Sequence, residues 1–121
     1  MMIVLAARTH GLDVLDGVFL DLEDEAGFAF ACEQGRNMGF DGKTLIHPKQ
    51  LAAANRIFAP TEKELQTAAK VVAAWTEARA QGKGICVVDG RLIEKLHVEE
   101  FERMIALDRA IRGALAAADA A

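Results

Sequence analysis

The stretch GFDGKTLIHPKQ, residues 39–50, carries the clearest fold signal in this chain. A glycine turn leads into a short apolar run, residues 43–47, which stops at His47 and Pro48. A run of this length suits a β-strand, and proline suits the first turn of a helix, where its missing N–H costs nothing. The stretch therefore predicts a strand over residues 43–47 and a helix that begins at Pro48.

The residues before this stretch show the same order of elements. The run VFLDL, residues 18–22, is β-prone and ends in charge, and apolar side chains then recur at helical spacing over residues 25–38. Gly39 would close that helix. Strand, helix and strand within about thirty residues form a βαβ unit, whose right-handed crossover implies a parallel sheet. We therefore predict an α/β fold with parallel strands in this part of the chain.

The second half of the chain has a different character. Thr61 and Glu64 have the spacing of a capping box, which predicts the start of a long amphipathic helix. Asp89-Gly90 lies between two apolar runs, and this pair favours the tight turn of a β-hairpin because both residues accept positive φ. A last helix is expected from about Val98. This half is therefore predicted to be mostly helical with one hairpin.

Length and composition limit the classes of protein. With 121 residues, the chain falls short of the roughly 250 of a complete (β/α)₈ barrel, and its 52% hydrophobic content is enough for a core. A net charge of -4 without a basic run argues against nucleic acid and acidic membranes as partners. The N-terminal apolar stretch is too short for a signal peptide or a membrane span. Cys32 and Cys86 lack metal-ligand spacing, so we expect reduced thiols in a cytoplasmic protein.

Four acidic residues follow the first predicted strand: Asp21, Glu23, Asp24 and Glu25. The carboxyl ends of parallel strands are the usual place for active-site groups, and carboxylates can hold Mg²⁺. Acids just before a helix also cap its N-terminus and favour its dipole. Both interpretations stay open from the residues alone, and capping is the simpler one.

Two further stretches could carry chemistry. His47 and Pro48, flanked by Lys43 and Lys49, end the second predicted strand, and the lysines could receive a phosphate there. A structural strand exit is an equally good interpretation. Asp89 could act as a general acid or base in a suitable pocket, and it is also simply a good turn residue.

The residues of three segments show a family resemblance. The segments are LDVLDGVFLDLEDEAGF (12–28), MGFDGKTLIHPKQLAAANRIFAPTEKEL (38–65) and VVDGRLIEKLHVE (87–99). In this order they resemble the C-terminal portion of the citrate lyase beta subunit and malyl-CoA lyase family of HpcH/HpaI aldolase-like proteins. The resemblance extends over nearly the whole chain.

This resemblance implies a fold and an activity. The fold would be the C-terminal fragment of a (β/α)₈ TIM barrel, with the last two βα units in residues 1–59. Residues 18–22 and 43–47 would be the last two barrel strands, and residues 60–121 a helical lid and oligomerisation extension with a β-hairpin. The implied activity is a carbon-carbon lyase that acts on coenzyme A or acyl-carrier thioesters through a Mg²⁺-stabilised enolate.

The resemblance also implies roles for particular residues. Asp89 would do acid/base work at the acyl carbon, in the active site of a neighbouring subunit, so a homo-oligomer with a swapped C-terminal extension is expected. His47, Pro48 and Lys49 would lie near the coenzyme A path. The family's Mg²⁺ ligands and its substrate-binding arginine lie on earlier barrel strands and have no counterpart here. We therefore assign no metal ligand and expect the isolated chain to be inactive.

A non-catalytic alternative remains open at this point. Without the metal and arginine positions, the chain could be a remnant that acts as an oligomerisation or interaction module. Open sheet edges and apolar helix faces would favour such assembly. Retention of Asp89 in its turn favours the enzyme interpretation.

Overall fold

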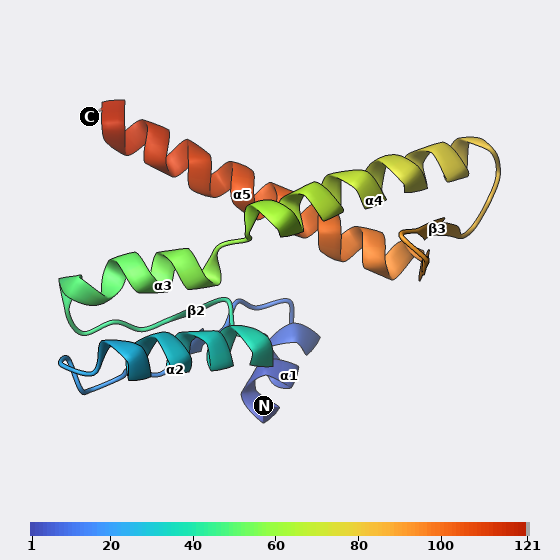
Figure 1. The fold of residues 1–121 in the computed structure, drawn as a ribbon. Coiled ribbons are helices and arrows are strands. Elements are labelled where there is room, and N and C mark those ends of the chain that lie inside the picture. The colour runs from blue at the N-terminus through green and yellow to red at the C-terminus, as the bar shows by residue number, and fades with distance from the viewer. Residues whose placement is uncertain (121) are drawn as a thin grey trace. The chain divides into compact units, whose positions relative to one another are not determined.

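The computed structural model describes residues 1–120. It divides into two compact units, unit 1 from Met1–Ala59 and unit 2 from Pro60–Ala121. Most of both units is helical, as Figure 1 shows. The barrel and lid roles expected for these two parts of the chain stay predictions.

Unit 1 contains short strands between helices. Its elements, in chain order, are α1 (Met2–Thr9), β1 (Leu15–Asp16), α2 (Glu25–Met38), β2 (Gly42–Lys43), the 3-10 helix η1 (Pro48–Gln50) and α3 (Leu51–Phe58). β1 pairs in parallel with β2, with Leu15 opposite Gly42 and Asp16 opposite Lys43. The parallel pairing through a crossover helix is therefore confirmed.

The predicted positions of the two strands are wrong. Residues 18–22 are not a strand, and residues 44–47 lie beyond the end of β2. The pairing ends because side chains bond the backbone there: Gly17 N donates to Asp16 Oδ1 at 2.8 Å. Gln50 likewise bonds the backbone of Phe19 and of Ile46. These backbone groups are thus satisfied without a neighbouring strand.

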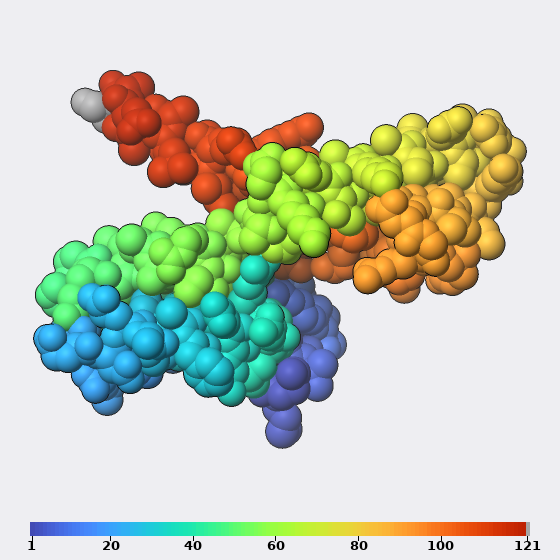
Figure 2. Space-filling view, in the orientation of Figure 1, coloured from blue at the N-terminus to red at the C-terminus, as the bar shows by residue number. Residues whose placement is uncertain are grey.

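α2 and α3 form the core of unit 1. Phe28, Cys32 and Ala54 are buried between them, and Phe19, Leu45 and Ile57 pack against this cluster. The two helices lie side by side in Figures 1 and 2, α2 in blue to cyan and α3 in green. α2 has the bounds that the sequence predicts, because Asp24 caps its start and Gly39 closes it at φ 99.

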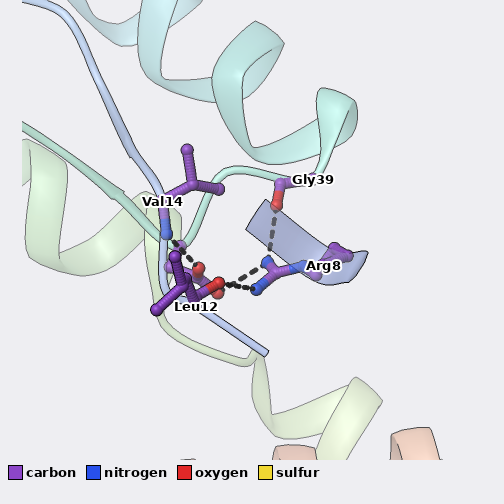
Figure 3. Close-up of polar contacts among 5 residues, drawn as sticks. Arg8, Leu12, Val14 and Gly39 are labelled. Atoms are coloured by element: carbon purple, nitrogen blue, oxygen red, sulfur yellow. Dashed lines mark hydrogen bonds and ion pairs between the residues drawn. The ribbon is translucent and has the colours of Figure 1, made fainter. Parts of the chain in front are cut away.

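One arginine joins α1 to the loop before β2 (Figure 3). The Nη2 atom of Arg8 donates to Gly39 O and to Asp41 Oδ1, each at 2.8 Å, and its Nη1 donates to Leu12 O at 3.3 Å. Asp41 Oδ2 in turn accepts from Val14 N at 2.8 Å. This network holds α1 against the start of both strands.

A partly buried ion pair links the two strands. Lys43 Nζ lies 3.2 Å from Asp16 Oδ2, and only 4% of the Lys43 side chain is exposed. Asp16 packs so closely on α2 that a Cβ at Gly35 would lie 2.9 Å from its Oδ2. Burial raises the pKa of the nearby Cys32 thiol, while the charge of Lys43 acts in the opposite direction.

Unit 2 is a helical pair with a hairpin. Its elements are α4 (Glu62–Ala80), β3 (Cys86–Val88), β4 (Arg91–Ile93) and α5 (Lys95–Ala120). The two strands are antiparallel, and Val71, Val88, Ile93 and Val98 form the buried cluster beneath them, with Trp75 and Phe101 packed against it. Figure 1 shows α5 crossing α4 and extending past it, and the side chains of residues 112–120 are exposed.

Local signals predicted unit 2 well. The capping box is confirmed, with Glu64 N donating to Thr61 Oγ1 at 3.2 Å and Thr61 N donating to Glu64 Oε1 at 3.3 Å. The hairpin at Asp89-Gly90 is also confirmed. α5 begins at Lys95, earlier than predicted, because His97 Nδ1 accepts from Glu94 N at 3.0 Å and so caps its first turn.

In the part of the chain that the structure describes, no helix combines the length and apolar character needed to span a bilayer.

Candidate functional site

Both strands of unit 1 lead into loops at the same edge of the sheet. Parallel strands place their carboxyl ends together, and here the loop after β1 and the loop after β2 meet. A pocket of about 260 Å³ is lined by the loop after β1, the first turns of α2, η1 and α3. Its lining comprises acids (Asp21, Asp24, Glu25), cations (Lys49, Arg56), one amide (Gln50) and apolar side chains (Leu22, Phe28, Ala29, Ala52, Ala53).

The acidic residues mainly organise the loop and α2. Asp24 Oδ1 accepts from Gly27 N at 2.9 Å, which is the capping role. Asp21 Oδ1 accepts from Glu23 N at 3.0 Å. Across residues 1–120, no three His, Cys, Asp or Glu side chains are placed to hold a metal ion. Within residues 1–120, Asp21 and Asp24 therefore serve the backbone of the loop and of α2.

His47 and Pro48 begin η1, and Lys49 lines the pocket. His47 Nδ1 accepts from Lys49 N at 3.1 Å, so that ring nitrogen is engaged and Nε2 is the atom left to meet a ligand. Lys49 Nζ lies 3.5 Å from Glu23 Oε1. Of the three residues assigned to the coenzyme A path, the structure brings Lys49 to the pocket. His47 and Pro48 directly precede it, at the start of η1.

Gln50 and Arg56 are residues of this site that the sequence analysis missed. Gln50 is only 4% exposed and is the buried polar side chain among the described residues. Its position four residues before the buried Ala54 places it on the inner face of the helix, and this helical spacing was the available signal. Arg56 lies on α3 and presents a guanidinium to the pocket.

Asp89 lies at the tip of the hairpin in unit 2. Its φ is 50, a left-handed value that is uncommon outside glycine and is best tolerated by Asp and Asn. Its Oδ1 lies 2.5 Å from Lys70 Nζ on α4, and both side chains are more than half exposed. The carboxylate is thus presented to solvent on a defined turn, beside a cation that the sequence analysis did not single out.

Known proteins resemble this chain over most of its length. Residues 1–48 match the family model of the HpcH/HpaI aldolase/citrate lyase family. The (3S)-malyl-CoA thioesterase of Cereibacter sphaeroides is 49% identical over 108 residues, which cover 89% of this chain and 38% of that protein. Citrate lyase subunit beta of Leuconostoc mesenteroides subsp. cremoris is 39% identical over 108 residues, 89% of this chain and 36% of that protein.

A solved structure shares the fold. The protein CitE from Mycobacterium tuberculosis, in complex with magnesium, acetoacetate and coenzyme A, superposes with a TM-score of 0.70 at 28% identity. The superposition covers 86% of this chain and 38% of that one. The fold is therefore one found in citrate lyase-type proteins, which are TIM-barrel-like.

These likenesses confirm the resemblance that was read from the residues. The family model over residues 1–48 and the relatives over most of this chain both point to the HpcH/HpaI aldolase/citrate lyase family. The chain spans 38% of the length of the (3S)-malyl-CoA thioesterase that it matches.

Proposed function

We propose that this chain contributes to an enzyme that acts on a coenzyme A thioester of a hydroxy acid, by cleavage of the carbon-carbon bond next to the thioester carbonyl. The observation that carries the proposal is the 49% identity to a malyl-CoA thioesterase over 108 residues, a match that extends over both units. The citrate lyase subunit among the relatives supports the lyase reaction.

Asp89 is the residue proposed to move a proton. Cleavage between the α and β carbons of a β-hydroxyacyl thioester passes the β-hydroxyl proton to a base and leaves an enolate. A carboxyl can deliver the proton that the α carbon of this enolate takes up. The exposed turn position suits a carboxyl that must reach a site outside its own hairpin. We propose that this site lies in a second copy of the protein, in a homo-oligomer.

Lys49 and His47 are proposed to meet the coenzyme A portion. The ammonium of Lys49 at the pocket can pair with a phosphate, and Arg56 adds a second cation on the same wall. His47 offers its Nε2, because Nδ1 is occupied by Lys49 N. The apolar lining around Phe28 can take the less polar part of the same ligand.

The link between magnesium and this proposal is the solved structure of a relative. CitE from Mycobacterium tuberculosis was solved with magnesium and coenzyme A. Because residues 1–120 hold no group of three His, Cys, Asp or Glu side chains placed to hold a metal ion, we assign no step to a metal on this chain's own side chains.

Hydrolysis of the thioester is a second candidate, favoured by one observation. The relatives called thioesterases are 49% identical, ahead of the citrate lyase subunit at 39%. The two reactions differ in their products. With malyl-CoA, a lyase releases acetyl-CoA and glyoxylate, whereas a thioesterase releases malate and free coenzyme A.

The first experiment is titration of coenzyme A and acetyl-CoA into the purified chain, with light scattering to measure its oligomeric state. We expect binding by an oligomer, and weaker binding by about tenfold after Lys49→Ala. Lys63→Ala, an exposed lysine on α4, is the matched control and should bind normally. Absence of binding by a folded oligomer would favour the non-catalytic interaction module instead.

A further inference from the structure

The buried amide of Gln50 links η1, which lines the pocket, to the loops after both strands. Gln50 Oε1 accepts from Ile46 N at 3.0 Å, in the loop after β2. Gln50 Nε2 donates to Phe19 O at 3.1 Å, in the loop after β1, which forms the facing wall of the pocket. The side chain is 4% exposed, and both bonds are partly buried.

The chemistry of this position requires an amide. A buried polar group is costly unless it is hydrogen-bonded, and here one end must accept while the other must donate. A glutamine side chain has both functions on one planar group, whereas an ionised carboxylate can only accept. The two bonds therefore depend on the identity of the side chain as well as on its size.

Sheet pairing does not extend to these loops. The register of β1 and β2 ends with Asp16 opposite Lys43, and Phe19 and Ile46 lie beyond it. Gln50 supplies a polar connection across this unpaired region, and it also lines the pocket itself. The separation of the two pocket walls thus depends on this side chain.

We propose that Gln50 is a positioning residue, which holds the loop of Asp21 and Asp24 at a defined distance from the loop of His47 and Lys49. The inference rests on the proposed function, in which those loops receive a coenzyme A thioester. It goes beyond that function by assigning the geometry of the pocket to a residue that need not touch the reacting atoms.

Gln50→Glu tests the donor end. The introduced carboxyl has the same shape and can still accept from Ile46 N, but when ionised it places an oxygen against Phe19 O. When protonated it can donate there again, and burial raises the pKa of such a carboxyl above its ordinary value of about 4.3. We expect coenzyme A affinity to fall by about tenfold at about pH 8 and to recover to within about twofold of wild type at about pH 5.

The control must carry the same chemical change at a position where no buried hydrogen bond is lost. Gln34→Glu introduces the same carboxyl at an exposed position of α2 in the same unit. The affinity of this variant for coenzyme A should equal that of wild type at both pH values. The titratable and charged groups around Gln50 are Asp21, Asp24, Glu25, His47, Lys49 and Arg56. All of them are present in both variants, so the ratio of the two affinities isolates position 50.

A second measurement does not depend on ligand binding. Hydrogen exchange of the Ile46 amide reports the bond to Gln50 directly, and Gln50→Met removes both bonds at similar volume. We expect exchange to be faster in Gln50→Met at both pH values. In Gln50→Glu we expect it to be faster at about pH 8 and close to wild type at about pH 5.

The outcomes separate the two proposals. Equal affinity of Gln50→Glu and Gln34→Glu at about pH 8, or a loss that does not reverse at about pH 5, would overturn the role of Gln50. If wild type binds no coenzyme A, the proposed function fails, and the positioning role is then decided by Ile46 exchange. Unchanged exchange in Gln50→Met would overturn that role as well.

Discussion

The ammonium of Lys70 lies 2.5 Å from a carboxylate oxygen of Asp89, which joins the middle of α4 to the tip of the β3–β4 hairpin. Asp89 is also the one described non-glycine residue with positive φ. The carboxylate is therefore held by its turn and by a neighbouring cation. These contacts explain how a side chain proposed to move a proton is kept in a defined place.

The turn conformation of Asp89 gives the first prediction. Asp89→Gly and Asp89→Asn should keep the hairpin, since both residues tolerate left-handed φ. Asp89→Val should lower the free energy of unfolding by about 1 to 2 kcal/mol. Urea unfolding followed by circular dichroism measures the difference. Equal stability of the Val and Gly variants would contradict the conformation described here.

The network of Arg8 gives the second prediction. Arg8→Ala removes the donors to Gly39 O, Leu12 O and Asp41, and should destabilise unit 1 by about 1 to 2 kcal/mol. Arg8→Lys should recover part of this loss, because a lysine keeps the charge without the planar fork. The free energies of unfolding of both variants, measured through the amide signals of unit 1, test this order: wild type most stable, then Arg8→Lys, then Arg8→Ala. A stability of Arg8→Ala equal to that of wild type would rule out a structural role for the network.

The partly buried ion pair between Asp16 and Lys43 gives the third prediction. Asp16→Asn leaves the ammonium of Lys43 without its counter-charge and should lower the free energy of unfolding by about 1 to 3 kcal/mol, because Asp16 is partly exposed. The double variant Asp16→Asn with Lys43→Met should recover most of this loss. Asp13→Asn, at an exposed position, is the control. If the double variant were less stable than Asp16→Asn alone, the pair would not be acting through uncompensated charge.

The buried thiol of Cys32 gives the fourth prediction. Burial raises its pKa above the ordinary value of 9.0, with Lys43 opposing, so the folded state binds its proton more tightly than the unfolded state. The corresponding stability is present below pH 9.0 and is lost as pH rises through the folded pKa. In Cys32→Ala, the free energy of unfolding should fall less steeply as pH rises above 9.0. Thiol labelling at neutral pH should modify the partly exposed Cys86 first.

A faster reaction of Cys32 than of Cys86 would contradict the burial of Cys32. An unfolding free energy of Cys32→Ala that falls above pH 9.0 as steeply as that of wild type would show that other groups cause the decline.

Helix boundaries and the hairpin could be predicted because their signals are local. The Thr61 and Glu64 capping box, the closing glycine of α2 and the Asp89-Gly90 turn each act within a few residues of the chain. The start of α5 was missed because a histidine took the capping role. The residues themselves singled out His47, Lys49 and Asp89 as candidates. The family resemblance suggested their roles, which remain proposals.

By itself, the sequence determined the family resemblance, the parallel crossover, the bounds of α2 and the start of α4. Local spacing and short-range hydrogen bonds decide these helix ends. Only the tertiary structure decided where β1 and β2 stop, since that depends on which partner bonds each backbone group. It alone also showed Gln50 between two loops and Lys70 beside Asp89. Contacts between residues nineteen or thirty-one positions apart leave no periodic signal in the chain, because packing rather than spacing brings them together.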